Sequence, residues 1–141
     1  MRSATNRQRH WIPVAILVGV LYALVGVTFA VPTTHVHLWR LAAWVLSALA
    51  FAAHLGYDHF WQRYRPRSVA GHVALAAAVG AFGLAVGANL HSLSVPSTDQ
   101  HRRLLLIALF VWPAITALPT FLVGLSVSSV LRYLFRTEPV Q

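Results

Sequence analysis

Four long apolar stretches, separated by short polar segments, dominate the hydrophobic pattern of this chain. A helix rises 1.5 Å per residue, so about 20 apolar residues are needed to cross the hydrocarbon core of a bilayer. Strand-like alternation is absent from these stretches. The pattern predicts an all-α fold: a polytopic membrane protein forming a four-transmembrane-helix antiparallel bundle, with residues 1–141 as a single domain. The predicted spans cover about residues 12–31, 38–57, 69–90 and 104–130.

Composition supports this interpretation and excludes a water-soluble globule. Of the 141 residues, 57% are hydrophobic and only 10% are charged, whereas soluble domains carry about 25% charged residues. The absence of Cys excludes disulfides, thiolate metal sites and Cys nucleophiles. Three acidic residues in the whole chain leave little room for paired-carboxylate catalysis, and no metalloprotease, serine-triad or phosphate-loop motif occurs. The sequence therefore favours a protein that is not an enzyme.

The distribution of arginine predicts the orientation of the helices. All eleven basic residues are Arg, and eight of them lie in the two terminal tails and in the connection between the second and third spans. These segments share one side of a bundle with an even number of spans, and the positive-inside rule places that side in the cytoplasm. We therefore predict that both termini are cytoplasmic. Because a chain rich in Ala with Arg as its only base is typical of GC-rich bacterial genomes, we expect the bacterial inner membrane.

The same distribution argues against nucleic acid as a partner. The arginines border the apolar runs and do not form a basic face on a polar domain. The lipid bilayer is the partner that this pattern predicts.

Small residues form a stripe along one face of the third predicted helix, and a weaker stripe follows the first. At 100° per residue, positions spaced three or four apart share a face. Small residues let membrane helices approach closely, so we interpret the stripe as a packing surface. It could also join the chain to a homo-oligomer or a larger membrane complex, and a groove for a flat ligand is the alternative. The stripe on the third helix contains His72, Ala76, Gly80, Gly83, Gly87 and His91, and that on the first contains Ala15, Gly19, Ala23, Gly26 and Ala30.

Two histidines lie near the predicted cytoplasmic ends of adjacent helices. His54 is followed four residues later by Asp58, so the two side chains point the same way and can share a hydrogen bond. His72 begins the third helix on the same side. We take His54 and His72 as candidate cofactor-binding residues, which could ligate a haem b or form a protonatable pair. The alternative is an ordinary solvated pair at the membrane interface.

Four further histidines fall on the opposite side of the predicted bundle. Neutral imidazoles suit Zn, Cu or Ni, so these residues are candidate ligands of a divalent metal ion. The alternative is that they are solvated loop histidines. The four are His35, His37, His91 and His101.

The fourth predicted helix contains Pro113 and Pro119. Each proline frees a backbone carbonyl one turn earlier, which a Thr or Ser hydroxyl can re-satisfy. A kinked helix is the simpler interpretation, and a hinge or a polar lining for a substrate path is the alternative. Hydroxyl-bearing or small residues follow at every fourth position: Thr116, Thr120, Gly124 and Ser128.

Three functions are compatible with these features. The first is a small non-catalytic integral membrane protein, acting as a subunit of a complex or as a homo-oligomer. The second is a haem b or quinone-linked redox protein with His ligands. The third is a small transporter or channel, for which polar groups near the bilayer midplane are few. The residues favour the first.

Overall fold

The computed structural model describes residues 11–30, 34–61, 65–94 and 98–135. Helices contain 95% of these residues, and no strand occurs among them, which confirms the predicted all-α class. Four of the helices are long and apolar enough to cross a membrane. In chain order the elements are α2 (Trp11–Ala30), α3 (Val36–Gly56), the short π-helix η1 (Tyr57–Trp61), α4 (Pro66–Leu93) and α5 (Asp99–Leu134).

Local capping sets helix ends that apolarity alone does not predict. Pro66 occupies the first turn of α4, where its fixed φ suits a helix and its missing N–H costs nothing. At the start of α5, Thr98 Oγ1 accepts a hydrogen bond from the His101 backbone N–H at 3.3 Å, and the acidic Asp99 lies in the first turn. Both helices therefore begin several residues before the predicted spans. Val31, the last residue of the first predicted span, lies outside the described residues.

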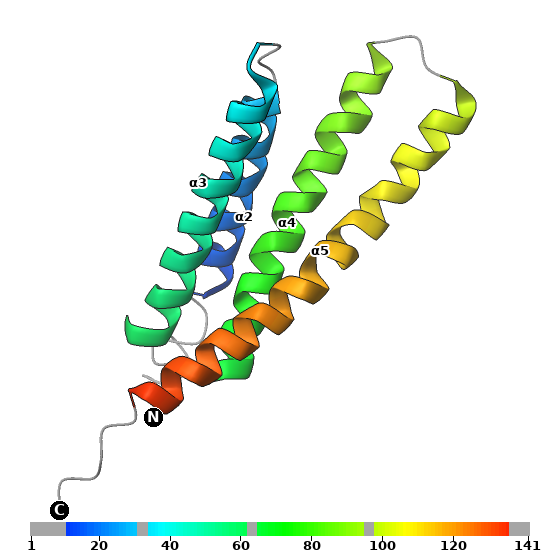
Figure 1. The fold of residues 1–141 in the computed structure, drawn as a ribbon. Helices are drawn as coiled ribbons and strands as arrows, with labels where there is room; N and C mark the ends of the chain where they lie inside the picture. The colour runs from blue at the N-terminus through cyan, green and yellow to red at the C-terminus, as the bar shows by residue number, and fades with distance from the viewer. Residues whose placement is uncertain (1–10, 31–33, 62–64, 95–97, 136–141) are drawn as a thin grey trace, which may run out of the picture.

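Successive long helices run antiparallel, and α4 lies between α2 and α5 (Figure 1). The burial of side chains agrees with this central position, because ten residues of α4 are buried but only two each of α3 and α5. α3 lies along α2 and reaches α4 where α3 ends. α2 begins, α4 begins and α5 ends at that same end of the bundle, which we call the η1 end (Figure 1).

The two predicted stripes of small residues face each other and bring α2 and α4 close together. A Cβ atom added to Gly19 would lie 2.6 Å from Val79 Cβ and 2.8 Å from the Ala76 carbonyl oxygen. One added to Gly80 would lie 2.6 Å from Tyr22 Cβ. The stripe on α4 is therefore a packing surface within the chain, and α2 covers the face that we considered for an oligomer.

Small and polar residues also hold α4 against α5. A Cβ atom on Gly124 would lie 2.7 Å from Val73 Cγ2, so the two helices are in close contact at the η1 end. Toward the other end, Asn89 Nδ2 donates a hydrogen bond to the Leu105 carbonyl oxygen at 2.8 Å. This interhelical bond satisfies a polar side chain that the sequence places inside an apolar span.

α5 continues as one helix through Pro113 and Pro119. Thr116 Oγ1 donates to the Trp112 carbonyl oxygen at 2.8 Å, and Thr120 Oγ1 donates to the Thr116 carbonyl oxygen at 2.7 Å. The carbonyls that lose their helical donor lie four residues before each proline, and neither hydroxyl bonds to them. The expectation that the threonines repair the proline breaks is therefore wrong, because each hydroxyl bonds the carbonyl four residues before itself.

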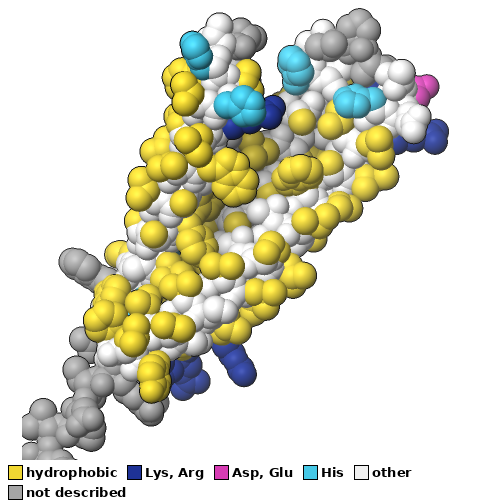
Figure 2. Space-filling view, viewed as in Figure 1, with side chains coloured by type: hydrophobic (Ala, Val, Ile, Leu, Met, Phe, Trp, Pro, Cys, Tyr) yellow, Lys and Arg dark blue, Asp and Glu magenta, His cyan; other side chains and the backbone are white. Residues whose placement is uncertain are grey.

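Hydrophobic side chains cover the outer faces of the helices, and charged side chains lie near their ends (Figure 2). Large apolar side chains are strongly exposed on several helices, for example Leu17 at 70%, Trp44 at 77% and Phe110 at 79%. Figure 2 also shows a hollow between α3 and α5, because these helices diverge away from the η1 end.

Candidate functional site

All four long helices contribute to packing at the η1 end. Leu55 of α3 and Val69 and Val73 of α4 form the buried hydrophobic cluster, against which Phe51 and Leu131 pack. Because Leu131 belongs to α5, this cluster joins α3, α4 and α5. It lies on the same turns as the ionisable residues described next.

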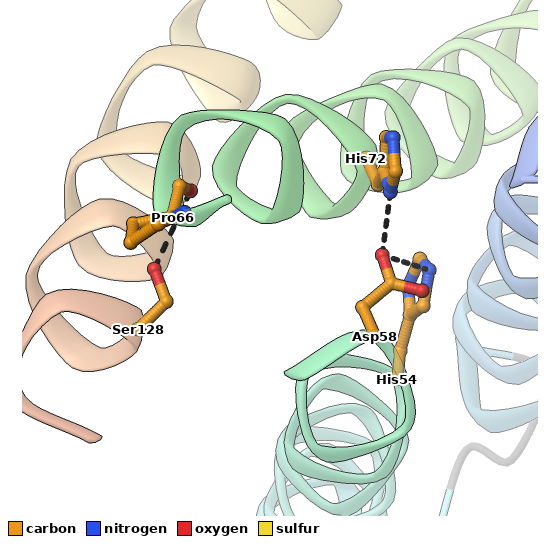
Figure 3. Close-up of polar contacts among 5 residues, drawn as sticks. All are labelled: His54, Asp58, Pro66, His72 and Ser128. Atoms are coloured by element: carbon orange, nitrogen blue, oxygen red, sulfur yellow. Dashed lines mark hydrogen bonds and ion pairs between the residues drawn. The ribbon is translucent and has the colours of Figure 1, made fainter. Parts of the chain in front are cut away.

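Asp58 is the centre of a buried polar cluster, the histidine–aspartate cluster, which consists of His54, Asp58 and His72 (Figure 3). Asp58 is only 2% exposed. Its Oδ2 atom lies 2.6 Å from His72 Nδ1, which is a short hydrogen bond across from η1 to α4. When Asp58 is ionised its carboxylate can only accept, and His72 Nδ1 then donates the proton of this bond.

His54 lies against the same carboxylate oxygen but does not reach hydrogen-bonding distance. Its Nε2 atom is 3.9 Å from Asp58 Oδ2, and the two side chains are only 1% and 3% exposed. The other ring nitrogen, Nδ1, is buried with no hydrogen-bond partner. A buried polar atom without a partner costs about 1–3 kcal/mol. Such atoms are rare in folded proteins and often mark a functional site.

The helix changes to the π form between His54 and Asp58, and the two side chains do not form the predicted hydrogen bond. The backbone N–H of Tyr57 bonds to the carbonyl oxygens of both Ala53 and His54. The sequence correctly placed His54 beside Asp58, but the carboxylate makes its hydrogen bond to α4.

Trp11 adds the contribution of α2 to the cluster. Its ring stacks on the His72 ring with a centroid distance of 4.3 Å and an interplanar angle of 11°. Trp11 was not among the site residues predicted from the sequence, although it precedes Ala15 by four residues and lies on the same face as the small-residue stripe of the first helix. His72 likewise continues the stripe of α4. Two facing stripes therefore bring the two rings together.

Within the described part of the chain, only the two imidazoles pair with the Asp58 carboxylate. The arginines described at this end, Arg65, Arg67 and Arg132, are all exposed. A carboxylate that is removed from water must be paired or neutralised. The histidine–aspartate cluster therefore has the chemistry of a proton-holding group, in which two bases and one acid share a buried space.

The cluster does not have the layout of a haem site held by His54 and His72. Two axial imidazoles require the iron between their ring nitrogens, and Figure 3 shows the Asp58 carboxylate between the two rings. A haem at these residues would have to displace a carboxylate that bonds His72 at 2.6 Å. Haem binding stays a prediction that this geometry does not favour.

The four histidines proposed as metal ligands lie at the opposite end of the bundle, and all are exposed. His35 precedes α3 with a left-handed backbone, φ 53°, and its carbonyl oxygen accepts the first helical bonds. His37 begins α3, His91 lies in the last turn of α4 and His101 in the first turn of α5. No three His, Cys, Asp or Glu side chains among the described residues could hold one metal ion. The structure therefore does not assemble the predicted metal site.

Two further polar residues inside the helices were not singled out from the sequence. Asn89 crosses from α4 to α5, as described above. The Tyr22 hydroxyl is buried with no hydrogen-bond partner, on the part of α2 that faces Gly80. Both residues stand out as polar positions in otherwise apolar spans, and that contrast is the signal by which they could have been found.

Comparisons with models of protein families, with curated proteins and with solved structures find no match to this chain. The function must therefore be inferred from the residues and their geometry.

Proposed function

We propose that this chain is a small integral membrane protein that crosses the bacterial cytoplasmic membrane four times and has no catalytic role of its own. In this proposal it acts as a subunit of a larger membrane complex or as a homo-oligomer. The observation that carries the proposal is the apolar exterior of four helices that are each long enough to span a bilayer. In water, continuous apolar surfaces of this extent cause aggregation, whereas lipid tails cover them at no cost.

The distribution of charge supports the same proposal. Among the described residues, every Arg lies within about two turns of a helix end and is exposed. Polar side chains within α4 and α5, such as Asn89 and Ser128, form hydrogen bonds within the protein. Helices satisfy their own backbone groups, as a lipid environment requires.

The orientation rests on which segments adjoin the η1 end. α2 and α4 begin there and α5 ends there (Figure 1), and in the sequence the Arg-bearing segments are those that precede α2, precede α4 and follow α5. The positive-inside rule favours this side as the cytoplasmic one. Both termini are then cytoplasmic.

Reporter fusions test both the number of spans and the orientation. We expect a periplasmic signal from fusions after Thr34 and Thr98, and a cytoplasmic signal from fusions after Arg65 and Gln141. Alkaline phosphatase and green fluorescent protein provide the complementary pair of reporters. An external signal at Arg65 or Gln141 contradicts the orientation, and release of the intact protein from membranes by alkaline carbonate contradicts integral insertion.

The oligomer, if one forms, must use a surface other than the small-residue face of α4. α2 already packs on that face, with Gly19 and Gly80 at the closest approach. The outer faces of α2, α3 and α5 carry large exposed apolar side chains and remain uncovered. Native mass spectrometry of the protein extracted in mild detergent distinguishes a monomer, a homo-oligomer and a complex with other chains. A monomer that extracts and behaves alone would contradict the subunit role.

A further inference from the structure

We propose that the histidine–aspartate cluster is a proton-binding site, in which the Asp58 carboxylate and two imidazoles hold an exchangeable proton between α3, η1 and α4. The proposal goes beyond membrane insertion and assembly, because it assigns a ligand, the proton, to three named side chains. The reaction is an acid–base step: His54 Nε2 accepts a proton and faces the carboxylate as a cation, and it returns the proton when the solution becomes more alkaline.

The distances place one carboxylate oxygen within reach of both rings. Oδ2 accepts from His72 Nδ1 at 2.6 Å, while His54 Nε2 lies 3.9 Å away. A movement of about 1 Å would bring His54 to hydrogen-bonding distance. A proton on Nε2, which is present in one neutral tautomer and in the imidazolium, supplies the donor that such a bond needs. In the imidazolium form, His54 faces the Asp58 carboxylate as a cation.

The second ring nitrogen of His54 supports an exchangeable state rather than a fixed structural role. Nδ1 is buried and has no hydrogen-bond partner, although the whole residue is only 4% exposed. A purely structural buried histidine is expected to have its polar atoms bonded. Ionisable groups inside membrane-spanning segments commonly take part in proton transfer. His54 has both an unbonded buried nitrogen and a position inside one of the four long apolar helices.

Among the described residues, the groups that face the cluster from neighbouring elements add no further buried titratable side chain to its three members. α2 contributes the Trp11 ring, which does not titrate and stacks on His72. Next to Asp58 in η1, Tyr57 is exposed and the His59 ring packs edge-on against Phe60. The remaining described charges at this end are on exposed side chains: Arg65, Arg67 and Arg132.

The location of the site gives proton binding a structural consequence. α3 packs mainly along α2, and Asp58 forms the hydrogen bond that ties the end of this segment to α4. The protonation state of the cluster therefore affects how firmly η1 is held against α4. We expect the site to act at the cytoplasmic end of the bundle if the orientation proposed above is correct.

Nuclear magnetic resonance of the imidazole nitrogens tests the proposal on the full chain in detergent micelles. Spectra of protein with ¹⁵N-labelled histidine are recorded between about pH 5 and pH 9, the range in which imidazoles titrate. His54→Gln and His72→Gln identify the two signals. We expect His54 and His72 to change protonation in linked steps, because their charges face the same carboxylate. In Asp58→Asn we expect the titration of the His54 signal to change, because the carboxylate that faces its ring is removed.

The exposed His37 provides the matched control, since His37→Gln removes an imidazole from α3 at the opposite end and should leave both midpoints unchanged. If Asp58→Asn does not fold, His54→Gln provides the second test, because it keeps the bond from His72 to Asp58. The pH dependence of the His72 signal should then lose the step that is linked to His54.

Three results would overturn the proposal: no change of protonation at His54 across the range, midpoints in Asp58→Asn equal to those of the wild type, or a His72 titration that His54→Gln leaves unchanged. Stoichiometric zinc that is bound by the wild type and lost in Asp58→Asn would also overturn it, by showing a metal site instead. These measurements report on the cluster in micelles, so they remain valid whatever the reporter fusions show about orientation.

Discussion

The close contact between α2 and α4 predicts that adding a single methyl group at Gly19 destabilises the protein. In Gly19→Ala, the new Cβ atom would lie 2.6 Å from Val79 Cβ and 2.8 Å from the Ala76 carbonyl oxygen. Both of these atoms are fixed to the backbone, so no side-chain rotation relieves the contact. The two helices must move apart, and the neighbouring contact between Gly80 and Tyr22 opens with them.

Two opposing effects set the change in the free energy of unfolding that Gly19→Ala causes. Overpacking a close contact costs about 1–3 kcal/mol, whereas replacing Gly by Ala inside a helix gains about 0.5–1 kcal/mol. Gly19→Ala should therefore lower the free energy of unfolding by about 1 kcal/mol. Gly71 provides the matched control, because a Cβ atom there meets nothing within 4 Å. Gly71→Ala should show only the gain from replacing Gly by Ala in a helix, without the cost of overpacking. The free energies of unfolding of the two variants should therefore differ by about 1–3 kcal/mol.

The assay is reversible unfolding in mixed detergent micelles with increasing dodecyl sulfate, followed by tryptophan fluorescence and circular dichroism. The free energies of unfolding of both variants are compared with that of the wild type. If Gly19→Ala is as stable as Gly71→Ala, the two helices do not approach as closely as the structure shows, and the packing argument fails.

Three further predictions follow from the other contacts. Asn89→Ala removes the hydrogen bond to the Leu105 carbonyl oxygen and should cost about 1 kcal/mol in the same unfolding assay. Ser126→Ala, which removes only a bond within α5, should cost less, and equal losses would mean that the interhelical bond contributes nothing. No three metal-ligating side chains gather among the described residues, so elemental analysis should find only trace metal. The amount should not change when His35 and His37 are both replaced by Ala. Near-stoichiometric Zn or Cu that the double variant loses would restore the metal hypothesis. Protein expressed with added haem should be colourless, and a Soret band in the purified protein would contradict this.

The sequence was sufficient to predict the helices, because their main determinants are local. A run of about 20 apolar residues must form a helix to satisfy its backbone in lipid, and each predicted span falls on a long helix. The sequence also predicted the two stripes of small residues, since the period of the helix decides which residues share a face. It did not reveal that these stripes pack on each other, because a stripe does not specify its partner.

The candidate site also has features that the sequence predicts and features that depend on the tertiary structure. That His54, Asp58 and His72 lie at one end of the bundle follows from the order of the spans alone. Which of them form a hydrogen bond does not, because the bond from His72 to Asp58 depends on how α4 packs beside η1. The stacking of Trp11 on His72 likewise depends on how α2 packs against α4. The period and length of a helix are properties of consecutive residues, but a contact between helices depends on their relative rotation and depth, and only the tertiary structure determines these.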